Sequence, residues 1–446
     1  MHESDETTTS GKIRRRQFLT ATAGSVAGLA LSAAPAGART AMPAEPPPQR
    51  RVVHTGLAAL IESRYASLRG QRVGAIANPT SVTTSLIHEV DVMHASPDVD
   101  LVAVFGPEHG FRGTAQAGGS EGDSIDPRTG LPVYDLYAKS WQDMTAIFDK
   151  AGVQTVMFDI QDVGARFYTY IWTMYDAMTA AAATARRFVV LDRPNPIGGV
   201  RVAGPRLEPR LATGVGKAPI AQQHGMTVGE LARLFAAEYV PDRAGHSLEL
   251  TVVPMTGWRR DLDGTATGLR WVAPSPNIPT VTTAQVYAGL CYFEGTNLSQ
   301  GRGTTQPFEI VGAPYLDERW AAALAAGQLP GAAFREAAFA PTSSTYTGQV
   351  CRGVQTYVTD ATAFDPVHTA VAMLVALRRI YPDFAWRYDT GDPIDPYWLD
   401  KLAGTDQVRR DIDAGKDADA VVAGWQSGLD AFRTLRAKYL MYGSTR

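Results

Sequence analysis

The chain has 446 residues, of which 45% are hydrophobic, and a formal net charge of −3. A charge so close to zero provides no broad electrostatic attraction for nucleic acid or for an anionic membrane surface. Beyond the amino-terminal region, no apolar stretch reaches the roughly 20 residues that a transmembrane helix needs. The length suggests a globular protein of about two domains.

The first residues have the features of an export signal. Three consecutive arginines, Arg14, Arg15 and Arg16, precede a mildly apolar segment and an Ala-x-Ala site that ends at Ala38. This pattern resembles a twin-arginine signal peptide. We expect cleavage to remove residues 1–38, residues 39–55 to form a Pro-rich leader, and the mature protein to act outside the cytoplasmic membrane without stable membrane insertion.

Apolar runs of strand character then alternate with segments of helical character. The strand-like runs cover residues 73–77, 101–104, 153–158 and 188–191, and the helical segments cover residues 86–94, 141–150 and 170–185. This alternation predicts an α/β fold with a parallel, twisted sheet and right-handed crossovers.

Polar side chains follow each strand-like run, namely Asn78, Glu108, Asp159 and Asp192. Because the carboxyl ends of parallel strands meet at one edge of a sheet, we expect these side chains to converge on one crevice. The alternative is that the Asp and Asn residues cap helices or form turns.

The run at residues 105–113 is the most informative of the chain. Glu108, His109 and Arg112 lie together in a glycine-bracketed turn directly after a strand-like run. Loops held by a rigid scaffold often carry reactive groups. Since Glu is a poor helix cap, the position of Glu108 favours a chemical role over capping.

The alternating pattern ends near residue 254, and a Pro- and Gly-rich connection follows at residues 270–280. We place a boundary there, between a catalytic domain at residues 56–278 and a smaller α+β domain at residues 279–446. For the second domain we predict helical segments at residues 318–326, 367–380 and 418–440 and a strand at residues 353–358.

Several long, ordered runs carry a resemblance to a known family. They lie at residues 105–113, 158–174, 191–199, 224–231, 271–280 and 294–308. Together they resemble the exo-β-N-acetylmuramidase family (NamZ-type) of peptidoglycan-recycling glycosidases. The resemblance implies a Rossmann-like amino-terminal domain, a smaller carboxyl-terminal domain and an active-site cleft between them. It also implies release of N-acetylmuramic acid from the non-reducing ends of peptidoglycan fragments.

The chain departs from the family pattern after residue 113. Family members tend to carry a short Ala-Gly-Glu segment, whereas this chain reads AGGSEGD at residues 117–123. If the family's acid contributes to binding, Glu121 would replace it at a shifted position. No nucleotide cofactor is expected, since no Gly-x-Gly-x-x-Gly follows the first strand-like run.

Glycosidic cleavage commonly uses two carboxyl groups. Glu108 is our candidate for the general acid, the role that the family's Glu fills, and burial would raise its pKa. Asp159 is the preferred second group. Asp162 and Glu294 are alternatives, and the substrate's own acetamido group is another. Asp162 would equally well form a structural ion pair with Arg166.

Muramic acid carries a lactyl carboxylate, which planar guanidinium groups can hold in bidentate fashion. Arg166 and Arg302 are the candidates, followed by Arg112; each would alternatively pair with an acid of its own scaffold. The remaining candidate substrate-binding residues are Asn78, His109, Tyr168, His224 and Asn297. For each of these, a structural role in a turn or in the core is the competing interpretation.

Other functions are less well supported by the sequence. A metal-dependent hydrolase would need ligands such as His109 and His224, but no His-Glu-x-x-His or Cys/His pair at ligand spacing is present. A Gly-x-Ser-x-Gly match at residues 118–122 lies between loop-like flanks rather than between a strand and a helix. A non-catalytic peptidoglycan-binding protein would use the same aromatic and arginine residues. Oligomeric state, stereochemical outcome and a bond between Cys291 and Cys351 stay open.

Overall fold

The computed structural model describes residues 52–444. The predicted signal peptide at residues 1–38 and most of the predicted leader at residues 39–55 lie outside the described residues. Within this range, no helix is both long enough and apolar enough to span a bilayer.

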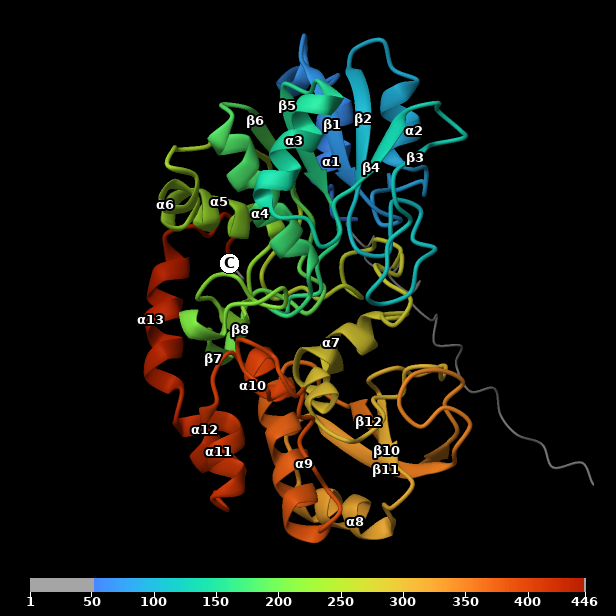
Figure 1. Cartoon of the computed structure of the whole chain (residues 1–446), viewed down its shortest axis with the longest axis vertical. Coiled ribbons are helices and arrows are strands. Elements are labelled where there is room, and N and C mark those ends of the chain that lie inside the picture. Colours follow the sequence, from blue (N-terminus) through green and yellow to red (C-terminus); the bar gives the residue numbers. More distant parts are fainter. Residues whose placement is uncertain (1–51, 445–446) are drawn as a thin grey trace, which may run out of the picture. The chain divides into compact units, whose positions relative to one another are not determined.

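A seven-stranded sheet forms the centre of the amino-terminal half (Figure 1), in the order β3-β4-β2-β1-β5-β6-β9. Its strands are β1 (Arg72–Ala77), β2 (Asp100–Gly106), β3 (Ser124–Ile125), β4 (Pro132–Asp135), β5 (Thr155–Asp159), β6 (Arg187–Leu191) and β9 (Glu249–Val253). Every neighbouring pair is parallel except β3 with β4. The predicted α/β fold is therefore confirmed. The central strands are continuous apolar runs because both faces of a parallel sheet are covered.

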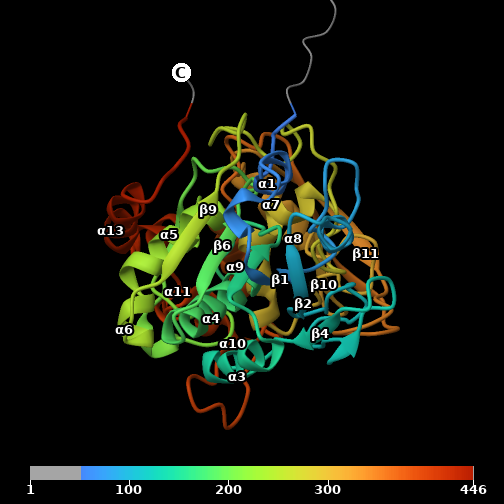
Figure 2. The same cartoon turned by 90° about the horizontal axis from the view of Figure 1, so that it is seen from above.

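Helices cover both faces of this sheet (Figure 2). Helices α1 (Gly56–Glu62) and α2 (Glu89–His94) pack on one face, where Leu57 and Val90 join an apolar cluster with the strands. Helices α3 (Trp141–Ala151), α4 (Tyr170–Ala183) and α5 (Val228–Glu238) pack on the other face, followed by the short α6 (Val240–Ala244).

Local signals explain where these helices begin and end. A capping box of Ser140 and Asp143 opens α3, and Gly152 in the left-handed conformation closes it. The predicted helix at residues 86–94 starts later than expected. Leu86 has a φ of 63°, incompatible with a helix, and His88 acts as the N-cap of α2.

The carboxyl-terminal half contains a second, antiparallel sheet in the order β10-β12-β11. Its strands are β10 (Ile310–Ala313), β11 (Ala332–Phe339) and β12 (Cys351–Val358). The surrounding helices are α7 (Val281–Leu290), α8 (Glu318–Gly327), α9 (Pro366–Ile380), α10 (Trp398–Ala403), α11 (Gln407–Asp413), α12 (Ala418–Ala423) and α13 (Gln426–Ala437). The prediction of one helical segment at residues 418–440 was wrong, because the chain leaves the helix at Gly424 and Trp425.

The two halves share one apolar core. Phe167 contacts Tyr287 edge-to-face, with ring centroids 5.2 Å apart, and both belong to a cluster that extends into α9. The chain end returns to the first sheet, where the Tyr442 hydroxyl donates to Asp192 Oδ2 at 2.6 Å. The boundary at residue 278 stays a prediction. Cys291 and Cys351 are both buried free thiols.

Candidate active site at the carboxyl edge of the sheet

The turn after β2 is held in a tight conformation that presents Glu108. His109 has a φ of 72° and Gly110 a φ of 84°, both in the left-handed region. His109 is fixed there because its backbone N donates to Gly119 O and its ring Nδ1 lies 3.0 Å from Ala115 O. A β-carbon at Gly110 would lie 2.2 Å from the Glu121 side chain. Only glycine therefore fits at this position.

Glu121 stabilises this turn through hydrogen bonds. Its carboxylate accepts hydrogen bonds from the backbone N of Arg112 at 3.1 Å and from the backbone N and hydroxyl of Thr114 at 3.0 and 2.9 Å. These contacts give Glu121, the residue at which the chain departs from the family pattern, a role in shaping the loop that carries Glu108.

The Glu108 carboxyl group is half-buried and makes two hydrogen bonds. Oε1 accepts from Gly118 N at 2.9 Å, and Oε2 accepts from the Thr169 hydroxyl at 2.7 Å. Thr169 is the N-cap of α4, yet its side chain does not cap the helix. Its hydroxyl serves Glu108 instead. The Glu108 charge also helps burial to raise the pKa of Tyr137.

A row of aromatic rings connects this turn to the carboxyl-terminal half. The ring of His109 lies 6.5 Å from that of Tyr170, which lies 5.0 Å from Tyr168. Tyr168 contacts Tyr287 at 5.8 Å, and Tyr287 contacts Phe308 at 4.7 Å. At the end of the row, Arg302 stacks over Phe308 and pairs with Glu294 at 2.6 Å. The structure thus arranges Glu108, His109, Tyr168, Glu294 and Arg302 along one path.

A second polar group lies beside Tyr168. His224 Nδ1 accepts from Met226 N at 3.2 Å, which leaves the proton on Nε2, 3.2 Å from Asp162 Oδ2. Asp162 Oδ1 and the Tyr168 hydroxyl are buried without a hydrogen-bond partner in the described residues. Burial and the neighbouring Tyr170 raise the pKa of Tyr168 well above its ordinary value. Buried polar atoms without partners are costly, so these two atoms are suited to a ligand or to water.

Asp159 has a different environment. It is fully buried, and Arg193 holds both of its oxygens, through Nε at Oδ1 and through Nη2 at Oδ2, the latter at 2.6 Å. The buried Glu89 lies beside this pair, and burial together with the Asp159 charge raises the pKa of Glu89 well above its ordinary value. A catalytic role for Asp159 stays a prediction, and this geometry favours a structural role.

Four further candidates from the sequence are committed to protein contacts. Arg166 is fully buried and donates to three backbone carbonyls, those of Pro205, Ile220 and Leu402. Arg112 pairs with Asp126 at 2.8 Å.

Both asparagines of the set hold loops together. Asn78 Oδ1 accepts from the backbone N and hydroxyl of Thr80. Asn297 binds the backbone of Asp383 and Ala385. These contacts fit the structural alternatives for Arg112, Asn78 and Asn297. The alternative ion pair between Asp162 and Arg166 was wrong, because the Arg166 guanidinium donates to backbone carbonyls instead.

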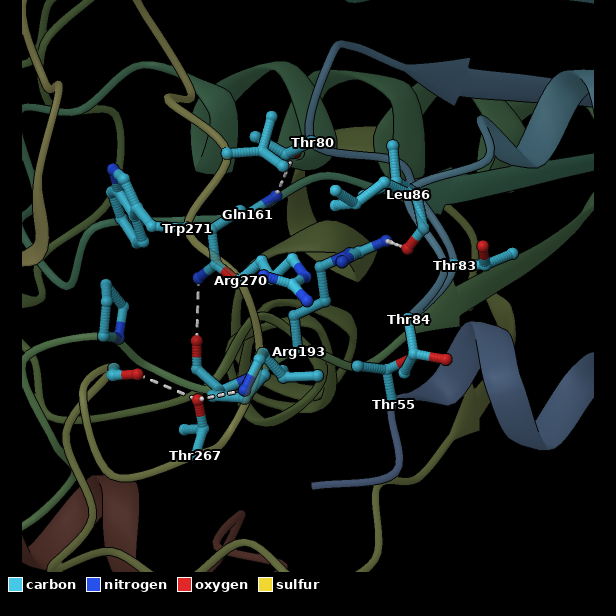
Figure 3. A pocket seen from close by; sticks show the side chains of 16 residues that line it. Thr55, Thr80, Thr83, Thr84, Leu86, Gln161, Arg193, Thr267, Arg270 and Trp271 are labelled. Carbon is cyan, nitrogen blue, oxygen red and sulfur yellow. Dashed lines mark hydrogen bonds between the residues drawn. The ribbon is translucent and has the colours of Figure 1, made fainter. Parts of the chain in front are cut away.

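A shallow hollow that is open to solvent lies at the same edge of the sheet (Figure 3). We call it the Arg270 hollow. Its sixteen lining residues are Thr55, Thr80, Val82, Thr83, Thr84, Leu86, Gln161, Arg193, Pro194, Pro196, Gly264, Thr267, Leu269, Arg270, Trp271 and Val272. Sequence reasoning missed it as a site. Arg270 and Trp271 lie in the Pro-rich connection, which has no periodic pattern. Gln161 lies between Asp159 and Asp162, and no motif marks it as a binding residue.

A larger hollow of about 1380 Å³ lies elsewhere, between residues 197–204 and the helices α9, α12 and α13. Its charged side chains already have protein partners; for example, Arg201 pairs with Asp365 at 3.3 Å, and Arg433 with Asp430 at 2.8 Å. In the part of the chain that the structure covers, no group of three or more His, Cys, Asp or Glu side chains is arranged to hold a metal ion.

Comparison with known proteins identifies the family. The family description "Exo-beta-N-acetylmuramidase NamZ, N-terminal" matches residues 73–282, and its carboxyl-terminal counterpart matches residues 285–442. The chain belongs to the NamZ exo-β-N-acetylmuramidase family. As a member of the NamZ family it is a glycoside hydrolase.

Relatives support this assignment. The peptidoglycan β-N-acetylmuramidase NamZ of Bacillus subtilis (strain 168) is 45% identical over 391 residues, which cover 87% of this chain and 91% of the relative. Two crystal structures of DUF1343 family proteins from Bacteroides fragilis have the same fold as this NamZ family member. One has a TM-score of 0.80 and 34% identity and covers 89% of this chain and all of the other. The second has a TM-score of 0.69 and 29% identity, with coverage of 88% and 99%.

Proposed function

We propose that this protein is an exo-acting β-N-acetylmuramidase that releases N-acetylmuramic acid from the non-reducing ends of peptidoglycan fragments. The Bacillus subtilis relative is named a peptidoglycan β-N-acetylmuramidase and is 45% identical over most of both chains. This likeness supports the assignment of the glycosidic bond that is cleaved. The observation that carries the mechanism is the half-buried Glu108 carboxyl group, held by two hydrogen bonds at the carboxyl edge of the sheet.

Glu108 acts as the general acid in this proposal. The backbone N–H of Gly118 always donates to Oε1, so the acidic proton belongs on Oε2. The Thr169 hydroxyl can rotate, and it therefore accepts a hydrogen bond from the protonated acid and donates one to the carboxylate. Breakage of the glycosidic C–O bond moves the proton from Glu108 to the leaving oxygen, while the sugar carbon gains positive character.

Asp162 and Tyr168 are suited to the other side of the reaction. Asp162 Oδ1 and the Tyr168 hydroxyl are buried and unpartnered among the described residues. The backbone N–H of Gly164 holds Asp162 by donating to Oδ2 at 2.7 Å, and His224 Nε2 lies 3.2 Å from the same oxygen. We assign them to binding the acetamido group or the attacking water.

The test is turnover of a chromogenic β-N-acetylmuramide by Glu108→Gln. General acid catalysis contributes about 10²–10⁴ in rate, so kcat should fall by about that factor. Glu121→Gln is the matched control, because Glu121 lies in the same loop but bonds to the Arg112 and Thr114 backbone and the Thr114 hydroxyl. Its kcat should change less than tenfold. Binding of the substrate by the unchanged protein without release of the chromophore would instead identify a non-catalytic peptidoglycan-binding protein.

We also propose export by the twin-arginine route, on the basis of Arg14, Arg15 and Arg16 and the Ala-x-Ala site. Residues 1–38 fused to a reporter that folds before export should carry it across the cytoplasmic membrane. Replacing all three arginines by lysine should retain the reporter in the cytoplasm, and export that is unaffected by this change would contradict the proposal.

A further inference from the structure

The Arg270 hollow carries positive charge without a matching acid in its wall. Two of its lining residues, Arg193 and Arg270, are cationic, and none is acidic. Figure 3 shows both guanidinium groups in the middle of the hollow, with Trp271 on one side and Thr83 and Thr84 on the other. Such a wall favours an anionic ligand.

The two arginines differ in how far their charge is compensated. Arg193 is matched by Asp159, whose two oxygens face its Nε and Nη2. Arg270 is exposed and, within residues 52–444, makes no ion pair or hydrogen bond. Arg270 therefore supplies the net charge of the hollow, and its planar guanidinium fits a carboxylate in bidentate fashion.

The rest of the wall has the chemistry of a sugar site. Thr83 and Thr84 contribute accessible hydroxyl groups, and Gln161 contributes its amide oxygen. The Thr80 and Thr267 hydroxyls and the Gln161 amide nitrogen already have protein partners. The Trp271 indole is held in place because its Nε1 donates to Ile278 O at 3.2 Å. Rings fixed in this way stack on the apolar faces of sugars, and hydroxyl and amide groups bind sugar hydroxyls.

The hollow is distinct from the Glu108 site, since Glu108 is not among its lining residues. The two are linked by the 270–276 segment. Pro274 O accepts hydrogen bonds from Asn78 Nδ2 and the Tyr170 hydroxyl, and Tyr170 follows the Thr169 that binds Glu108. Four residues earlier in the same segment, Arg270 lines the hollow.

We propose that the Arg270 hollow is a second carbohydrate-binding site, which takes a sugar that carries a carboxylate. Arg270 binds the carboxylate, Trp271 stacks on the ring, and the Thr83 and Thr84 hydroxyls and Gln161 Oε1 bind its hydroxyls. The identity of the natural ligand, a muramic acid residue of the glycan or the released sugar, rests on the proposed function.

The test uses the full chain with Glu108→Gln. N-acetylmuramic acid is titrated while tryptophan fluorescence is followed, and the signal from Trp271 is obtained as the difference from a Trp271→Phe variant. We expect a saturable change at Trp271. Arg270→Gln should weaken it at least tenfold, Arg270→Lys less, and the control Arg69→Gln, an exposed arginine whose guanidinium contacts only Arg64 O, not at all.

Two further probes define the ligand class. N-acetylglucosamine, which lacks the carboxylate, should bind at least tenfold more weakly than N-acetylmuramic acid at the Trp271 site. Inorganic phosphate should bind more weakly as well, because it has no ring to stack. Equal binding of N-acetylglucosamine, equal binding of phosphate, or an unchanged titration in Arg270→Gln would each overturn the proposal. Full turnover by Glu108→Gln would contradict the proposed function and leave this titration unaffected.

Discussion

Glu108 follows β2 and Asp159 ends β5, with β1 between these two strands. Both acids lie at the same edge of the sheet, yet their surroundings are opposite. Glu108 is half-buried and receives one backbone N–H and one hydroxyl hydrogen bond. Asp159 is fully buried, and an arginine takes both of its oxygens. A guanidinium can only donate hydrogen bonds, whereas a hydroxyl can donate to a carboxylate or accept from a carboxylic acid. Under the proposed mechanism, the counter-group rather than the place at the end of a strand would separate the reactive acid from the structural one.

The largest expected effect is on the stability contributed by the ion pair between Asp159 and Arg193. Arg193→Met leaves a buried carboxylate without its partner, which typically costs about 3–5 kcal/mol. Urea unfolding should show this loss, whereas Glu108→Gln should unfold within about 1 kcal/mol of the unchanged protein. If Arg193→Met lost less stability than Glu108→Gln, the division between the two acids would be incorrect.

Asp192 extends the comparison to pH. Burial raises its pKa to about 7, against hydrogen bonds from Tyr442, Gly229 and Thr227 that lower it. Since the folded pKa lies above the unfolded value near 3.9, the folded state holds more protons between pH 4 and 7, and stability falls as pH rises through this range.

The contribution amounts to at most about 4 kcal/mol, and it is fully present below about pH 4. Asp192→Asn should flatten the dependence of the unfolding free energy on pH between pH 4 and 7. An identical pH slope in the variant would show that Asp192 titrates normally in the folded protein.

A smaller effect is expected at the hydroxyl that serves Glu108. Thr169→Val keeps the shape of the side chain but removes the hydrogen bond to Oε2, which is worth about 1.5 kcal/mol or roughly tenfold in kcat. The measurement is kcat with the chromogenic muramide. Thr169→Ser should retain most of the activity. A Val variant as active as the Ser variant would show that the Thr169 hydroxyl does not contribute to catalysis.

The smallest effect is expected at Arg112, which lies four residues after Glu108 in the chain. Its side chain is 33% exposed and pairs with Asp126. Partly exposed pairs contribute about 1 kcal/mol or less, so Arg112→Gln should alter stability slightly and leave kcat within about threefold. A loss of kcat comparable to that of Glu108→Gln would return Arg112 to the catalytic site.

Local pattern was sufficient to predict the four central strands of the sheet and the position of Glu108 after one of them. The apolar runs at β1, β2, β5 and β6 are buried on both faces, which makes them recognisable in sequence. The short edge strands β3 and β4 carry too few apolar residues to be recognised. The helix break at Gly424 has little signal beyond the glycine itself.

The partners of the polar side chains could not be predicted, because they depend on contacts distant in the chain. Arg193 reaches Asp159 across the β5–β6 pair, 34 residues earlier, and Arg166 reaches Leu402 O, 236 residues later. Arg166 therefore took an unexpected role, and Arg193 was not recognised as the partner of Asp159. Arg270 was overlooked because a loop residue without a partner leaves no periodic trace in the sequence.

The most direct test of Glu108 as the proton donor is the dependence of turnover on the leaving group. Values of kcat/KM would be compared between the unchanged protein and Glu108→Gln for aryl β-N-acetylmuramides whose phenols range from acidic to weakly acidic. A missing proton donor matters most for a poor leaving group, so the deficit of the variant should grow as the phenol becomes more basic. A deficit that stays constant across the series, or no deficit at all, would contradict the assignment of Glu108.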